Sequence, residues 1–129
     1  MDSGKAEVDK EVKKYQDIQE EISALISQRN KFYQQANENG MVKQELDLLE
    51  DDAQASEVFK LIGPVLVKQD VGEARANVGN RLELIQREMG KVEKLIAEKQ
   101  VAQEAISEKV VEMQQAMQKA AAEGAQEAV

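Results

Sequence analysis

The chain has 129 residues, a net charge of −8 and a pI near 4.7, and the acidic balance disfavours nucleic acid and anionic membranes as partners. Aromatic residues make up only 3%, and the charged fraction of 33% with abundant Ala, Glu, Lys and Gln is typical of long helices, not of a compact globule. Without Cys or His there is no disulfide or zinc–thiolate site and the commonest general base is missing, so we expect no metal, no cofactor and no enzyme.

A first long helix is expected over about residues 5–49. Asn39 and Gly40 are weak helix formers, but continuation through them is favoured over a break. Apolar residues form a stripe along one face of this helix. The step of three from Tyr15 to Ile18 indicates a slip in the helical frame, and Arg29 falls on this stripe. The apolar residues that recur at helical spacing begin with Val8, Val12, Tyr15, Ile18 and Ile22.

The connection after this helix divides into an acidic loop and a β-hairpin. Residues 50–56 have no apolar period, and we interpret Glu50-Asp51-Asp52 as solvated surface and not as a metal or acid–base site. Two β-branched runs then flank Gly63-Pro64, which predicts a hairpin over residues 57–69.

A second long helix is expected over residues 71–119. Asp70 and Glu73 form a variant of the capping box at its start, and residues 120–129 are expected to fray. Eleven of thirteen positions that alternate by steps of four and three are apolar, and Lys99 and Gln103 are the two polar exceptions. Such a seam over about six heptads predicts a coiled coil. Its positions are Val78, Leu82, Ile85, Met89, Val92, Ile96, Lys99, Gln103, Ile106, Val110, Met113, Met117 and Ala120.

The two helices are nearly equal in length, so the chain can fold back on itself. We therefore expect one mainly α domain over residues 1–129, an antiparallel two-helix coiled coil with a β-hairpin between the helices. An isolated hairpin is marginally stable, and its apolar strands invite pairing with another chain. The residues expected to join subunits are Phe59, Leu61, Ile62, Val65, Leu66 and Val67.

The sequence of the hairpin and of the start of the second helix resembles that of β-type prefoldin subunits. The matching runs are Val-Phe-Lys-Leu-Ile-Gly-Pro-Val-Leu-Val-Lys-Gln-Asp at residues 58–70 and Gly-Glu-Ala-Arg-Ala-Asn-Val-Gly-Asn-Arg-Leu at residues 72–82. The resemblance implies a heterohexamer of two α-type and four β-type subunits, whose hairpins form a double β-barrel carrying six coiled-coil arms. It also implies an ATP-independent holdase, consistent with the absence of a P-loop motif.

Members of this family bind non-native actin, tubulin and other chains between their arm tips and deliver them to the cytosolic group II chaperonin. By this resemblance the client-binding residues lie at the free helix ends, where exposed apolar side chains and adaptable Met can contact unfolded segments. The same residues can equally be ordinary buried residues of the helix seam. They are Val8, Val12, Tyr15, Val110, Val111, Met113 and Met117.

Two alternatives remain open at this stage. A structural coiled-coil scaffold or tether explains the helices but not the hairpin. A subunit of a prefoldin-like complex for nuclear or transcription-linked assembly is equally compatible with the sequence. The N-terminus lacks the apolar region of a signal peptide, and no apolar run approaches the roughly 20 residues of a membrane span, so we expect a cytoplasmic protein, with a nuclear location also open.

Overall fold

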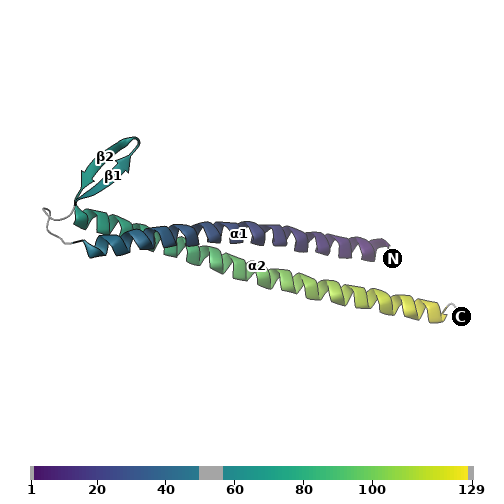
Figure 1. The fold of residues 1–129 in the computed structure, drawn as a ribbon. Helices are drawn as coiled ribbons and strands as arrows, with labels where there is room; N and C mark the ends of the chain where they lie inside the picture. Colours follow the sequence, from purple (N-terminus) through teal and green to yellow (C-terminus); the bar gives the residue numbers. More distant parts are fainter. Residues whose placement is uncertain (1, 50–56, 128–129) are drawn as a thin grey trace. The chain divides into compact units, whose positions relative to one another are not determined.

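A computed structural model describes residues 2–49 and 57–127 of the chain. Along the sequence it has helix α1 (Asp2–Leu48), strand β1 (Val58–Ile62), strand β2 (Val65–Gln69) and helix α2 (Val71–Glu127) (Figure 1). The expected mainly α fold with a hairpin between two long helices is confirmed. The acidic run Glu50-Asp51-Asp52 lies outside the described residues.

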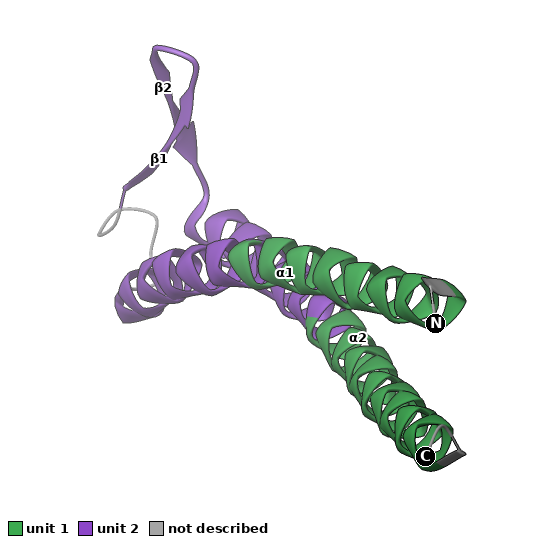
Figure 2. Ribbon diagram, turned by 90° about the vertical axis from the view of Figure 1, so that its right-hand side faces the viewer, with its two compact units in different colours: residues 1–27, 93–129 green, residues 28–92 purple. Residues whose placement is uncertain are grey.

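The chain divides into two compact units, and each helix contributes to both (Figure 2). Unit 1 comprises Met1–Ser27 and Glu93–Val129, and unit 2 comprises residues 28–92 with the hairpin. In unit 1, Glu11 is paired with Lys109 and Glu21 with Lys99. Residues further along α1 therefore contact residues earlier in α2. The same order holds in unit 2, where Asn39 meets Arg81 and Leu46 meets Arg75. The helical segments are therefore antiparallel within each unit.

The apolar seam expected on α2 faces α1. Val78, Ile85 and Val92 are buried in unit 2, and Ile96 is buried in unit 1. The positions between them that continue the alternation, such as Leu82 and Met89, are half-buried. Burial of these aliphatic side chains supplies the main favourable free energy of the helix pair, at about 25 cal/mol per Å² of apolar area.

The expected slip in the frame of α1 was wrong. Glu11 is only 7% exposed, whereas Val12 is 36% exposed, so the seam passes through the polar residue. With Glu11 included, the alternation by four and three runs unbroken, and Arg29 is a regular, half-buried member of it. The positions are Gly4, Val8, Glu11, Tyr15, Ile18, Ile22, Leu25, Arg29, Phe32, Ala36 and Asn39.

The ends of the helices differ in part from expectation. Helix α1 continues through Asn39 and Gly40 as expected, and the Asn39 side-chain amide donates to the Gln35 carbonyl at 2.7 Å. Helix α2 extends to Glu127, eight residues beyond the expected end at residue 119. The loss of the apolar seam does not end the helix, because residues 116–127 are mostly Ala, Gln, Glu and Lys, which are strong helix formers.

The hairpin turn and the start of α2 follow the expected local rules. Gly63 has a φ of 58°, and Pro64 follows it, which is the arrangement of a type II′ turn because only the first of its two central residues has positive φ. The Glu73 backbone amide donates to the Asp70 carboxylate at 3.1 Å, so Asp70 is the N-cap of α2.

Arg75 fastens the end of α1 to α2 within unit 2. Its Nε donates to the Leu46 carbonyl at 2.9 Å, and its Nη2 donates to the Leu49 carbonyl. These carbonyls belong to the last turn of α1 and the residue after it, where the regular pattern of helix hydrogen bonds ends; the Leu46 carbonyl also accepts from the Leu49 amide at 3.2 Å. The guanidinium therefore acts as a C-cap supplied by the partner helix.

Replacing Arg75 by alanine is expected to lower the free energy of unfolding by about 1–2 kcal/mol, because both carbonyls lose the guanidinium and the Leu46 carbonyl keeps only the Leu49 amide. Urea unfolding followed by circular dichroism measures the change. Arg87→Ala, an exposed arginine on the same helix, should change stability by less than about 0.5 kcal/mol. Equal effects of the two substitutions would show that the cap contributes nothing.

Candidate functional site

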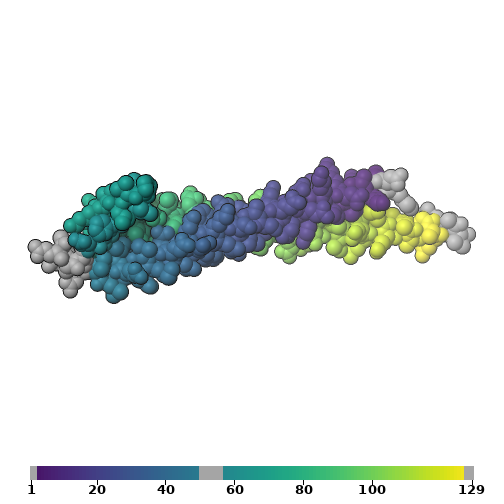
Figure 3. All heavy atoms as spheres, turned by 45° about the horizontal axis from the view of Figure 1, so that its top comes forward, coloured from purple at the N-terminus to yellow at the C-terminus, as the bar shows by residue number. Residues whose placement is uncertain are grey.

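The hairpin carries the densest group of exposed apolar side chains among the described residues, with six of them on two strands of 5 residues each. Their exposed fractions run from 44% at Val67 to 66% at Leu61. We call this set the hairpin surface, and it comprises the six residues expected to join subunits, namely Phe59, Leu61, Ile62, Val65, Leu66 and Val67. In the space-filling view the strands, drawn in teal, lie at the molecular surface (Figure 3).

Both faces of the hairpin are apolar. Leu61 pairs with Leu66 and Ile62 with Val65, and neighbouring side chains along a strand point to opposite faces. One face therefore carries Leu61 and Leu66, and the other carries Ile62, Val65 and Val67. At the start of β1 the hairpin joins a core, where Val58 packs against the cluster of Leu46, Ala74 and Val78.

The edges of this sheet are as open as its faces. Among the described residues the sheet has two strands, so each strand has one neighbour and one edge of unpaired backbone donors and acceptors. Such edges are templates for adding a strand from another chain. Two apolar faces and two free edges together make the hairpin suited to assembly and poorly suited to a solvated, isolated state.

The residues predicted to bind clients all lie in unit 1, and we call them the tip residues. There the start of α1 and the end of α2 lie side by side: a Cβ placed on Gly4 would be 3.5 Å from the Met117 sulfur. Their burial divides them. Val8 is buried in the seam and Val110 and Met113 are half-buried, whereas Val12, Tyr15, Val111 and Met117 are 36–48% exposed.

A small hollow lies beside Met117. Its volume is about 640 Å³, and it is lined mainly by small side chains and the backbone near Gly4, Ala120 and Ala121. Small residues on both helices leave space that the flexible Met117 side chain only partly fills. The sequence did not predict this hollow, because Gly and Ala occur both in helix interfaces and on exposed helix faces and so do not indicate a cavity.

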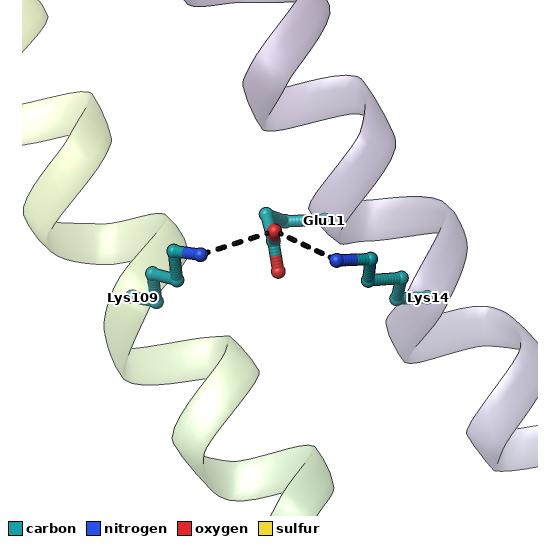
Figure 4. A network of polar contacts seen from close by, with 3 residues as sticks. All are labelled: Glu11, Lys14 and Lys109. Carbon is teal, nitrogen blue, oxygen red and sulfur yellow. Dashed lines mark hydrogen bonds and ion pairs between the residues drawn. The ribbon is translucent and has the colours of Figure 1, made fainter.

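Glu11 forms the most buried charged contact of unit 1, between the two helices (Figure 4). Its Oε1 accepts from Lys109 of α2 at 3.2 Å and from Lys14 of α1 at 3.3 Å. The hydrogen bond from Lys109 is the largest cause of a pKa for Glu11 below its usual value of 4.5, and partial desolvation opposes it. The carboxylate is therefore charged at neutral pH and links the two helices.

The contribution of Glu11 to stability should depend on pH in a defined direction. Because its pKa is lower in the folded than in the unfolded chain, the stabilisation is present above about pH 4.5 and is lost as the pH falls through the lowered value. We expect Glu11→Gln to reduce the melting temperature at pH 7 and to reduce it by less at pH 3. Thermal unfolding at both pH values tests this, with the exposed Glu20→Gln as control.

Two further polar contacts cross the seam of unit 1. The Gln103 amide, 8% exposed, donates to the Gln19 side chain at 2.8 Å and to the Tyr15 carbonyl at 3.4 Å. Lys99 pairs with Glu21 at 2.6 Å. Polar residues at seam positions fix the register of a coiled coil at a cost in stability. Lys99 and Gln103, the two polar exceptions in the α2 seam, thus both have defined partners on α1.

The similarity to known proteins extends over both helices and the hairpin. A family model described as "Prefoldin subunit" matches residues 9–122. The chain belongs to the prefoldin family. Prefoldin subunit 6 of Homo sapiens is 44% identical over 112 residues, which cover 87% of this chain and 84% of that protein. Prefoldin subunit 6 of Arabidopsis thaliana is 43% identical over 101 residues, 78% of this chain and 76% of that protein.

The fold agrees with that of a solved prefoldin structure. The crystal structure of the prefoldin beta subunit from Thermococcus strain KS-1 matches with a TM-score of 0.75 and 17% identity, covering 81% of this chain and 89% of that one. The resemblance to β-type prefoldin subunits read from the hairpin sequence is confirmed. Membership of the family gives the chain a chaperone-type role and implies assembly with other prefoldin subunits.

Residues 2–49 and 57–127 contain no group of three or more Asp or Glu side chains placed to hold a metal ion. Over the same residues no helix is apolar enough over a sufficient length to cross a membrane.

Proposed function

We propose that the chain is one subunit of a heterohexameric holdase of two α-type and four β-type subunits. The hairpin surface joins the subunits, and the tip residues bind non-native proteins of the actin and tubulin kind. The bound protein is then passed to a group II chaperonin in the cytoplasm. No step of this cycle requires ATP hydrolysis by the chain.

The observation that carries the proposal is the hairpin surface. Six large apolar side chains that are 44–66% exposed, on both faces of a two-stranded sheet, would be costly to keep in water. Burial against neighbouring hairpins recovers about 25 cal/mol per Å² of apolar area and also pairs the free edges. An assembly built on this sheet explains why the chain keeps such strands between two long helices.

The four exposed tip residues support client binding. Val12, Tyr15, Val111 and Met117 offer apolar surface without any opening of the helix pair. Non-native proteins expose apolar segments that such side chains can cover. Each contact is weak, but several arms that act on one client multiply their effect through avidity.

Native mass spectrometry of the chain co-expressed with α-type and β-type prefoldin subunits tests the assembly. The expected result is one six-subunit species that contains this chain, and the purified species should suppress aggregation of denatured actin without nucleotide. A stable oligomer of this chain alone that has no effect on aggregation would favour the structural scaffold instead.

A further inference from the structure

A groove in unit 2 lies between the hairpin and the helix pair and is separate from the tip residues. Its volume is about 400 Å³. The apolar part of its lining includes Val42 and Phe59, which are 47% and 51% exposed, and Val58. Side chains of the chain itself therefore leave this apolar surface largely open.

The charge of the groove is opposite to that of the chain. Among the described residues its charged lining consists of Lys60 of β1 and Arg81 of α2, with no carboxylate, although the chain has a net charge of −8. Neither cation forms an ion pair with any residue in the described ranges 2–49 and 57–127, and Arg81 donates only a long hydrogen bond of 3.5 Å to the Asn39 side chain. Both cations are exposed and free to bind an anionic group.

We propose that this groove receives a segment of a neighbouring prefoldin subunit in which an apolar side chain stands beside a carboxylate. The apolar side chain covers Val42 and the exposed part of Val58, and the carboxylate binds Lys60 and Arg81. Val58 and Lys60 lie on the same face of β1, so both can contact one bound segment. The inference rests on the assembly proposed above and adds the chemistry by which a neighbour is selected.

Continuity with the hairpin surface is the reason to assign a subunit to this groove. Lys60 of the groove lies directly opposite Val67 of the hairpin surface and on the same face of the sheet, so a neighbour that covers this face is already within reach of the groove. Apolar burial supplies affinity, whereas the charge pair mainly supplies specificity and speeds association. A neighbour with a basic side chain at this point would be rejected.

Zero-length carbodiimide cross-linking of the assembled complex tests the contact directly, because it joins an amine only to a carboxylate that already touches it. We expect an amide bond between Lys60 and an Asp or Glu of an adjacent subunit. Assembly without any such bond from Lys60 would overturn the inference and leave the proposed function standing. Failure of the chain to assemble at all would overturn both.

Charge reversal provides the second test. Lys60→Glu with Arg81→Glu is expected to weaken assembly about tenfold or more at low salt. Lys31→Glu with Arg87→Glu makes the same charge change at exposed positions of unit 2 outside the groove, and it should assemble as the unmodified chain does. Near 1 M salt, where the Debye length is about 3 Å, the difference between the two variants should shrink. Equal assembly of both variants at low salt would overturn the inference.

Discussion

Replacing Leu61 and Val67 by lysine will prevent the chain from joining any prefoldin assembly, whereas its helical content will be retained. Leu61 and Val67 lie on opposite faces of the hairpin and are 66% and 44% exposed, so the ammonium groups remain hydrated in the isolated chain. In an assembly that buries either face, each unpaired charge would cost several kcal/mol. The cost thus falls on association and not on folding. Native mass spectrometry of the co-expressed subunits and far-ultraviolet circular dichroism measure the two effects.

Leu84 and Val101 provide a matched control for this experiment. They are the same two residue types, are 53% and 69% exposed, and lie on α2 away from the hairpin. Leu84→Lys with Val101→Lys should therefore assemble normally. If the Leu61→Lys, Val67→Lys chain also assembles, the hairpin surface is not the joint between subunits.

The sequence predicted the apolar half of the fold well. The heptad positions of α2 that it marked, such as Ile85, Val92 and Ile96, are buried, because an aliphatic repeat of 3.5 residues has only one way to face a partner helix. The hairpin was equally predictable from Gly63-Pro64 between two β-branched runs, since few residue pairs fit its turn.

The polar half of the seam was not predictable in the same way. Glu11 is buried because Lys109, 98 residues away in sequence, comes within 3.2 Å of it. A search for apolar periodicity passes over such a residue and selects Val12 instead. The signal was nevertheless present: the frame that runs from Ile18 back to Val8 in steps of three and four requires position 11.

The candidate site shows a similar limit. The sequence predicted tip residues at the free ends of both helices, but which of these residues point into the seam depends on the frame of α1. Val8 proves to be buried, and Val12 is exposed, once Glu11 occupies the seam position between them. Exposure at Val111 and Met117 also depends on how the two helices face each other, which no single helix pattern specifies.

Replacing the four exposed tip residues by serine will remove most of the capacity of the complex to protect a client from aggregation, but the complex will still assemble. Val12, Tyr15, Val111 and Met117 present the apolar surface to which an unfolded segment can bind, and serine leaves none of it. Because these side chains are 36–48% exposed, their loss should affect the helix pair less than loss of a core residue such as Ile22 or Ile96. We expect the apparent affinity of the complex for denatured actin to fall about tenfold, since one arm of several is lost.

Leu95→Ser with Val101→Ser is the control, because it removes exposed apolar side chains from the same unit outside the tip residues. It should leave protection unchanged. A complex lacking residues before Ile18 and after Ile106 should assemble and fail to protect actin as the serine variant does. If the serine variant protects fully but the truncated chain does not, clients bind the half-buried residues Val110 and Met113 instead, and the helix pair must open to receive them. Full protection by both would place client binding elsewhere in the assembly.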